Sequence, residues 1–458
     1  MTALQRRVLI VAILASFMSI LDGSVVNLAL PAMTRELGGG LSSQQWIVDA
    51  YLLTLGSLIL LAGSLSDQFG RERIMRWGLI GFGITSVACG LAQSDLQLII
   101  ARAIQGIAGA LLVPSSLAMI MAAFSGKAQG RAIGQWTAAT GVAVVASPLI
   151  GGLAVDFLSW RVIFFINIIP ILIALPFLAK IPNLEESKSA RHIDFVGALL
   201  GVIGLGGSVF ALIEAPRLGL SDPSVWGPLA VGLLALVAFI WWEKRAKAPM
   251  MPLGLFSIRN FWVGNLSTFL TYGALSLGTL ALSLYLQQVV GLSATITGLA
   301  TIPSTIIMLT LSTYFGDFAG RIGPRIFMGL GPIIAGVGFL LMLTVSRDFN
   351  YWWQVLPGIL VFGLGLTMTV APLTAGILGA VPTANAGVGS AINNAISRIA
   401  GLITVALMGV IGGSTLGLDA LHRLVLATGL MMIAGGVISL IGIQNPRPDN
   451  AVAVSASK

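Results

Sequence analysis

Charged residues are scarce in this chain of 458 residues. Asp, Glu, Lys and Arg together make up 9% of the sequence, whereas hydrophobic residues make up 56%. A soluble globular protein carries about 25% charged residues, so this composition excludes an ordinary soluble domain. The 56 glycines fit the alternative, because glycine is frequent in membrane helices. The sequence therefore predicts an integral membrane protein, most of which lies in the bilayer.

Cysteine and histidine are also nearly absent, and each shortage excludes a kind of chemistry. Cys89 is the single cysteine, so the chain can form no internal disulfide. His192 and His422 are too few for a His-rich metal site or for a credible Ser–His or Cys–His catalytic pair. No G-x-x-x-x-G-K-S/T phosphate loop is present, so ATP does not drive the protein directly. We expect a protein that is not an enzyme and that has no metal and no cofactor.

Long apolar runs are what the sequence has in place of charge. A membrane-spanning helix needs about 20 mostly apolar residues, and fourteen stretches approach or exceed that length. The predicted spans are 8–30, 45–65, 74–92, 96–122, 131–155, 161–179, 193–213, 225–243, 259–289, 294–315, 324–345, 352–380, 386–412 and 421–443.

The basic residues are distributed unevenly between the two sides that these spans define. Of the 25 Lys and Arg residues, 18 fall on one side and 5 on the other, while Arg102 and Arg398 lie inside spans. Because cytoplasmic loops are rich in Lys and Arg, both termini are predicted to be cytoplasmic in a multi-pass protein of the inner membrane. The net charge of +8 is spread along loops, which argues against nucleic-acid binding.

An internal repeat divides the chain. The stretch Gly63 to Arg73 follows the second span, and Gly316 to Arg325 follows the tenth span with the same spacing of glycines. A duplicated six-helix unit with two helices inserted between the copies explains fourteen spans, and the predicted fold is all-α. The predicted parts are an N-terminal six-helix bundle (1–180), cytoplasmic connectors with two inserted spans (181–258), a C-terminal six-helix bundle (259–443) and a disordered cytoplasmic tail (444–458).

Three ionisable residues inside the N-terminal bundle carry the functional prediction. An ionised side chain at a helix centre costs about 2.5–3.5 kcal/mol, so such residues are functional by default. Asp22, Asp49 and Arg102 lie at similar depth in the outer half of the bundle. We predict that Asp22 pairs with Arg102 and that Asp49 acts as a third charge near them. Burial favours the protonated carboxyl and the arginine favours the ionised one, so a balanced site can exchange protons.

Structural roles are the alternative for each of these residues. Asp22 could hydrogen-bond to Ser24 or Asn27 and hold a kink, Asp49 could reach the lipid headgroups, and Arg102 could be a structural ion-pair partner. Secondary candidates for the same proton or substrate chemistry are Gln105, Glu214, Asn393, Asn394 and Arg398. Of these, Glu214 could be an interfacial acid and Arg398 could extend to the membrane surface.

The repeated loop resembles the signature of the major facilitator superfamily. The stretch from Gly63 to Arg73 matches the form G-x-x-x-D-x-x-G-R-R/E-K/R found between its helices two and three. The resemblance assigns gating to Gly63, Asp67, Gly70 and Arg71. Since Asp67 and Arg71 are four residues apart, they are expected to pair across one helical turn. In the family this carboxylate acts as a latch at the cytoplasmic end of span eleven, here near Gly323.

Three further motifs resemble the fourteen-helix drug:proton antiporter branch. Leu21 to Pro31 looks like the first-helix motif L-D-x-T-V-V-N-V-A-L-P, and Arg102 to Gly106 is similar to R-x-x-Q-G, which the family is thought to use in proton transfer. The stretch 141–152 resembles the fifth-helix motif G-x-x-x-G-P-x-x-G-G, with Ser147 where glycine is usual. The residues that this last motif assigns to a hinge are Gly141, Pro148, Gly151 and Gly152.

The resemblance implies a multidrug efflux antiporter, driven by the proton gradient and working by alternating access. Its expected partners are protons, the lipid bilayer and a small lipophilic substrate, and it is expected to be a monomer. No acidic residue lies well inside a predicted span of the C-terminal half, which favours monovalent cations or neutral compounds. The alternatives are export of one specific metabolite, antibiotic or lipid-like molecule, and an uncoupled facilitator.

Overall fold

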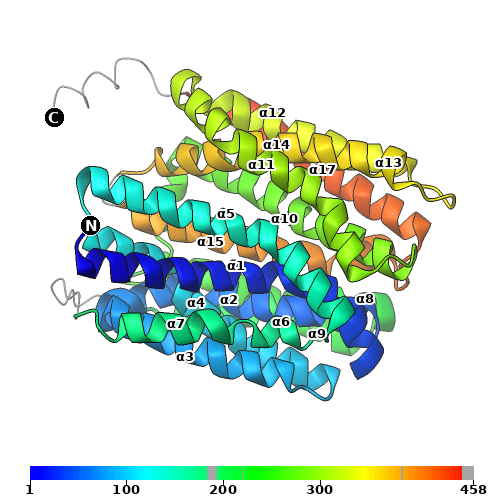
Figure 1. Ribbon diagram of the computed structural model, residues 1–458, viewed down its shortest axis with the longest axis horizontal. Coiled ribbons are helices and arrows are strands. Elements are labelled where there is room, and N and C mark those ends of the chain that lie inside the picture. Colours follow the sequence, from blue (N-terminus) through cyan, green and yellow to red (C-terminus); the bar gives the residue numbers. More distant parts are fainter. Residues whose placement is uncertain (183–192, 220, 383–384, 446–458) are drawn as a thin grey trace. The chain divides into compact units, whose positions relative to one another are not determined.

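The computed structural model describes residues 1–182, 193–219, 221–382 and 385–445, and this part of the chain is helical throughout (Figure 1). This confirms the predicted all-α class. Residues 183–192, which include His192 and part of the predicted connectors, and the predicted disordered tail beyond residue 445 lie outside the described residues.

The helices follow the predicted apolar stretches closely. In chain order they are α1 (Ala3–Leu37), α2 (Leu41–Phe69), α3 (Arg71–Gly90), α4 (Asp95–Ala123), α5 (Gly126–Phe157), α6 (Val162–Phe165), α7 (Ile168–Leu178), α8 (Phe195–Leu218), α9 (Pro223–Glu243), η1 (Leu253–Ser257), α10 (Arg259–Gln288), α11 (Ala294–Ile322), α12 (Arg325–Leu341), η2 (Met342–Thr344), α13 (Tyr351–Gln354), α14 (Leu356–Leu378), α15 (Ala386–Ala406), α16 (Met408–Gly412) and α17 (Leu418–Gly442).

Twelve helices in the described ranges are long and apolar enough to cross a bilayer, which makes this a multi-pass membrane protein. The predicted count of fourteen is not confirmed, because the third and sixth predicted spans fall short. Helix α3 has 20 residues but opens with the charged residues Arg71, Glu72 and Arg73. The sixth predicted span is a shorter apolar stretch, Val162–Leu178, interrupted between α6 and α7 at the polar residue Asn167.

Two compact units make up the structure. The first comprises residues 1–252, 276–302 and 401–424, and the second comprises 253–275, 303–400 and the described residues from Val425 onward. Helices α10, α11, α15 and α17 therefore each contribute to both units. The predicted division in chain order, into two bundles and an inserted pair, stays a prediction.

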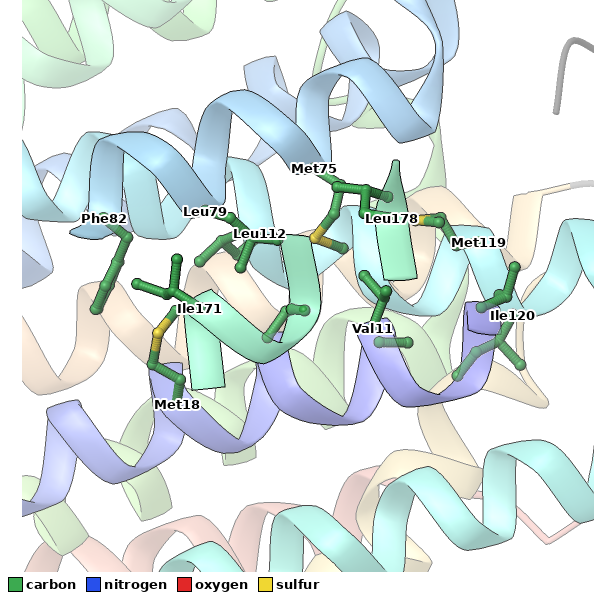
Figure 2. Packing of buried hydrophobic residues seen from close by; sticks show 14 of the residues in the cluster. Val11, Met18, Met75, Leu79, Phe82, Leu112, Met119, Ile120, Ile171 and Leu178 are labelled. Carbon is green, nitrogen blue, oxygen red and sulfur yellow. The ribbon is translucent and has the colours of Figure 1, made fainter. Parts of the chain in front are cut away.

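A hydrophobic core joins α1, α2, α3, α4, α5 and α7 of the first unit. Side chains from α1, α3, α4 and α7 point toward one another in Figure 2. The labelled members of this cluster are Val11, Met18, Met75, Leu79, Phe82, Leu112, Met119, Ile120, Ile171 and Leu178. Because α7 takes part in this core together with α3, both short predicted spans belong to the packed bundle and are not surface appendages.

Glycines set the close helix contacts in both units. A Cβ on Gly106 of α4 would collide with the backbone oxygen of Tyr51 in α2, so these helices cross closely one turn from Arg102. In the second unit, a Cβ on Gly338 of α12 would collide with the backbone of Phe362 in α14. Small residues at such crossings allow the van der Waals contact that holds helices together in a membrane.

Candidate functional site

Asp22 of α1 and Arg102 of α4 form a fully buried ion pair. Arg102 Nη1 donates to Asp22 Oδ2 at 2.6 Å, and the two side chains are 0% and 2% exposed. The predicted contact between them is therefore present. The pair can persist in an apolar interior only because each charge neutralises the other and further hydrogen bonds satisfy the remaining polar atoms.

Neutral polar side chains complete the surroundings of Asp22. Its Oδ1 accepts from Asn167 Nδ2 at 2.8 Å and from Gln105 Nε2 at 3.2 Å. Gln105 Oε1 in turn accepts from Arg102 Nη1 at 2.7 Å, and Gln105 Nε2 also donates to Ser86 Oγ at 2.9 Å. The site is thus a network of five side chains on α1, α3 and α4 and in the break between α6 and α7. We call it the Asp22 network.

Arg102 is also held by groups of α2 and α6. Its Nε donates to the backbone oxygen of Ile47 at 3.2 Å. Its guanidinium lies 4.2 Å from the centre of the Tyr51 ring and 5.9 Å from that of Phe164. Aromatic faces stabilise a desolvated cation, by as much as about 2 kcal/mol. A lysine could not make this set of contacts, because it lacks the planar fork of donors.

The structure does not support the predicted alternative in which Asp22 holds a kink through its neighbours. Ser24 Oγ donates to the backbone oxygen of Ile20 at 3.0 Å, and Asn27 Oδ1 is buried with no hydrogen-bond partner in the described part of the chain. Sequence reasoning found Asp22, Arg102 and Gln105 but missed Ser86 and Asn167. Asn167 is a polar residue in the mostly apolar run 161–179, but that position alone does not connect it with Asp22.

Asp49 of α2 is as deeply buried as Asp22 but has very different surroundings. Its side chain is 0% exposed, and neither carboxyl oxygen has a hydrogen-bond partner among the described residues. The structure therefore does not bring Asp49 into hydrogen bonding with the Asp22 network, although α2 contributes Ile47 to it. A buried, ionised carboxylate with no partner is strongly unfavourable, so Asp49 needs either a bound proton or an added cation.

The secondary candidate Glu214 is tied into local structure near the end of α8. Its Oε2 accepts from Arg217 Nη2 at 2.7 Å, and its Oε1 accepts from Trp46 Nε1 at 3.2 Å. These contacts fix the end of α8 against α2. They support the structural alternative for this residue.

The remaining candidates lie on α15 in the second unit. Asn393 Nδ2 donates to Asn265 Oδ1 at 3.0 Å and to Thr268 Oγ1 at 2.8 Å on α10. The backbone oxygen of Asn394 accepts from Ser397 Oγ. Arg398 Nε is buried without a hydrogen-bond partner among the described residues. This part of the second unit is therefore mainly neutral, and Arg398 is its cation.

The predicted gating loop connects α2 to α3. Asp67 Oδ1 lies 3.7 Å from Arg71 Nη2, so the predicted pair is present, and Arg71 Nη1 donates to the backbone oxygen of Ala118 at 3.2 Å. Gly70 between the two helices has φ +97°, a conformation that favours glycine, whereas Gly63 has open space around it. Arg71 thus ties the loop to α4, while Asp67 remains about half exposed.

The predicted hinge residues Gly141, Pro148, Gly151 and Gly152 all lie on α5. A Cβ on Gly152 would lie 2.5 Å from Cα of Thr295 in α11, and a Cβ on Gly151 would collide with a side chain of α1. These glycines therefore allow α5 to touch two helices closely. Their role in a hinge stays a prediction.

Two polar contacts that sequence reasoning missed hold helix ends in the first unit. The Asp156 carboxylate on α5 accepts from the backbone N–H groups of Ala294 (3.1 Å) and Thr295 (2.8 Å), at the start of α11. A carboxylate is favourable there because a helix N-terminus is positive. Gln45 Nε2 of α2 donates to the last two backbone oxygens of α15, at 2.7 and 3.0 Å.

The sequence matches a known family over most of its length. The model of the Major Facilitator Superfamily matches residues 12–405 and, in a second match, residues 264–457. The first match alone covers more than half of the chain.

Curated relatives cover the chain almost completely. Multidrug resistance protein Stp of Mycobacterium tuberculosis is 35% identical over 422 residues, which are 89% of this chain and 76% of the relative. Puromycin resistance protein pur8 of Streptomyces alboniger is 34% identical over 87% of this chain and 80% of its own length. The methylenomycin A resistance protein of Bacillus subtilis is 34% identical over 88% of this chain and 87% of its own length.

Solved structures resemble this protein in fold. The crystal structure of peptide transporter POT in complex with sulfate has a TM-score of 0.70 at 14% identity and covers 95% of this chain and 94% of its own. The crystal structure of a D-xylose–proton symporter has a TM-score of 0.68 at 16% identity, with 96% and 98% covered. At such low identity these likenesses show the fold alone.

Proposed function

The chain belongs to the major facilitator superfamily and is a transporter, and on that premise we propose that it is a proton-coupled multidrug efflux antiporter. Its substrates are lipophilic compounds that are neutral or carry one positive charge, and alternating access moves them out of the cell. Three observations support this proposal: the resistance proteins among the relatives, the scarcity of acids in the second unit, and above all the buried Asp22 network.

The Asp22 network supplies a mechanism for proton coupling. Ionised Asp22 accepts hydrogen bonds from Arg102, Gln105 and Asn167, which stabilise its negative charge. A proton on Asp22 removes that charge and leaves Arg102 without its counter-ion. The network must then rearrange or admit water. Protonation is thereby linked to helix packing, because the five side chains come from several different helices.

Asp49 supplies a second acidic group with a different task. Since no donor among the described residues reaches either of its oxygens, Asp49 can accept a proton or the positive group of a substrate without first breaking a contact. Proton and cationic substrate then compete for the same carboxylate, which is one way to couple opposite movements. A neutral substrate would rely on the Asp22 network alone.

We further propose the fourteen-helix arrangement of the drug:proton antiporter branch, with both termini in the cytoplasm. Helix α3 is 20 residues long, and at about 1.5 Å per residue it reaches about 30 Å, the thickness of the hydrocarbon core. The stretch Val162–Leu178 is at the short limit of about 17 residues for a span. These two lengths support the proposal that both stretches cross the bilayer in addition to the twelve longer helices.

Transport assays test the proposed function. Cells that express the protein should resist several chemically unrelated drugs, and an uncoupler should abolish that resistance. Everted vesicles should take up drug and release protons from their interior, whereas Asp22→Asn should abolish this coupling while leaving expression intact. Asp348→Asn, on an exposed loop residue, is the matched control and should behave as wild type.

The rival functions give different results in the same assays. Resistance to one compound alone would indicate a specific exporter of a metabolite, antibiotic or lipid-like molecule. Drug movement without proton movement would indicate an uncoupled facilitator. Undiminished coupled export by Asp22→Asn would remove Asp22 from the mechanism.

A further inference from the structure

A second pair of buried acids lies at one end of the inserted helices, away from the residues discussed so far. Asp194 immediately precedes α8, and Glu243 is the last residue of α9. Their side chains are buried, with residue exposures of 7% and 3%. Two acids so deeply buried need hydrogen-bond donors or opposite charges to be tolerated.

Each acid has one oxygen that is satisfied. Asp194 Oδ1 accepts from the backbone N–H of Gly197 and from Trp242 Nε1, both at 2.8 Å. Glu243 Oε2 accepts from the backbone N–H of Met251 at 3.1 Å. These bonds cap the start of α8 and connect the end of α9 to the segment that follows it.

The other oxygen of each acid is buried with no donor to accept from. Asp194 Oδ2 and Glu243 Oε1 both lack a hydrogen-bond partner among the described residues. They face the same point, because a Cβ on Gly197 would lie 2.6 Å from the first and 2.8 Å from the second. The two free oxygens therefore meet at the position that a side chain on residue 197 would occupy.

The cations that the structure describes near these two acids do not neutralise them. Lys244, Arg245 and Lys247 follow α9 but are exposed, and the ion pairs found in the described ranges include none of them. The guanidinium of Arg245 instead lies 4.3 Å from the centre of the Trp241 ring. A bound Mg²⁺ or Ca²⁺ would need about six oxygen ligands, and only two free oxygens converge here.

We propose that Asp194 and Glu243 bind one proton between them, as an O–H···O⁻ hydrogen bond. One proton satisfies both unpartnered oxygens at once and removes the repulsion between two ionised carboxylates. The pair, which we call the acid clasp, joins the start of α8, the end of α9 and, through Met251, the segment after α9. In the proposed orientation it faces the cytoplasm, so it responds to cytoplasmic pH independently of the Asp22 network.

The clasp makes a prediction about stability with a definite sign. When folded, the pair holds one proton near neutral pH, whereas in the unfolded chain both carboxyls are ionised there. Stability is therefore highest at low pH and falls as the pH rises, by about tenfold in the folding equilibrium per pH unit, until the pair loses its proton. In Glu243→Gln the amide donates to Asp194 Oδ2 with no proton to lose, so this contribution disappears.

The test compares melting temperatures of full-length protein in lipid nanodiscs, from about pH 5 to about pH 8. Wild type should lose thermal stability as the pH rises more steeply than Glu243→Gln, and the difference between the two isolates the clasp from other buried acids. The matched control is Asp222→Asn. Asp222 caps the opposite end of α9 as a single, partly exposed carboxylate bonded to Ser224, so this variant should keep the wild-type slope.

Infrared spectroscopy reports the proton directly. The carbonyl stretch of a protonated carboxyl group should be present in wild type and lost, at least in part, in both Glu243→Gln and Asp194→Asn. Equal pH slopes together with an unchanged carboxyl band would overturn the proposal. A melting temperature that Mg²⁺ raises in wild type but not in Glu243→Gln would also overturn it, in favour of a cation site.

A steric variant tests the geometry without changing either acid. Gly197→Ala would place a methyl group between the two free oxygens, and it should lower the melting temperature at acidic pH, where the clasp is closed. Gly201→Ala, one turn later on α8 with nothing within 4 Å of its added Cβ, should be tolerated. Equal behaviour of the two glycine variants would contradict the shared contact.

Discussion

The two units differ in the polar groups that they bury. In the described part of the chain, all five ion pairs lie in the first unit, and one of them, Asp22 with Arg102, is fully buried. The second unit buries neutral groups, such as Asn265 and Thr268 around Asn393, and Ser267, which accepts from Ser439 Oγ at 2.8 Å. Amides and hydroxyls do not titrate near neutral pH, whereas carboxylates can. The comparison therefore supports the proposal that proton chemistry belongs to the first unit.

Arg398 is a charged residue in the otherwise mainly neutral second unit, so it is the main exception to this comparison. It places a cation on α15, and its Nε has no hydrogen-bond partner in the described part of the second unit. A cation without a neighbouring acid repels a cationic substrate, so the acids that balance such a substrate must come from elsewhere. Among the described residues, Asp22 and Asp49 are fully buried acids inside spans, whereas Glu214 and Glu243 lie near the ends of α8 and α9.

The largest effect is expected for Arg102→Ala. Removing the guanidinium leaves Asp22 buried without its cation, which costs about 3–5 kcal/mol of stability and should abolish coupled export. The matched control is Arg217→Ala, which breaks the ion pair of Glu214 with a guanidinium 63% exposed and should cost at most about 1 kcal/mol. Thermal unfolding in detergent and drug export measure the two effects. Similar losses of stability and export in both variants would mean that burial does not make the Asp22–Arg102 pair more important than an exposed ion pair.

Asp49→Asn should separate stability from transport within the first unit. The carboxyl group accepts no hydrogen bond in the described structure, so its replacement by an amide should leave the melting temperature unchanged or higher. Export of a singly charged drug should fall about tenfold, a difference of about 1.4 kcal/mol, while export of a neutral drug persists. Transport assays with one substrate of each kind measure this. Equal effects on both substrates would show that Asp49 does not contact the substrate charge.

Asn393→Ala applies the same comparison to the second unit. The variant leaves Asn265 Oδ1 and Thr268 without their donor, which should cost about 1–3 kcal/mol of stability. The pH dependence of export should keep its wild-type midpoint, because no titrating group is removed. A shifted midpoint would break the comparison, since it would place part of the proton chemistry in the second unit.

How much of the candidate site could be predicted from the sequence depends on the chemistry of each residue. Charges in apolar runs are so costly that Asp22 and Arg102 could be matched across 80 residues of chain, and Asp67 and Arg71 are local neighbours. The Asp22 network also contains Asn167, which lies 145 residues from Asp22.

Neutral polar residues are cheaper to bury, so their positions do not single them out as charges do. Asn167 and Ser86 therefore could not be assigned to the site from the sequence. Asp156 and Gln45 were missed for another reason, because their partners are backbone groups at helix ends that no sequence pattern marks. The span count was hard to confirm where polar residues shorten an apolar run, as at the start of α3 and at Asn167.

The smallest effect is expected for Glu214→Gln. This variant tests whether an acid of the first unit outside the Asp22 network also takes part in proton coupling. Glu214 accepts from Arg217 and Trp46, and an amide oxygen can still accept from Trp46, so part of the contact between α8 and α2 survives. The lost charge pairs with an exposed arginine, and such pairs contribute at most about 1 kcal/mol. Export and its pH dependence should therefore stay close to wild type, as measured beside Asp22→Asn in the same vesicles. A strong loss of coupling in Glu214→Gln would extend the proton chemistry to the inserted helices and end the special position of the Asp22 network.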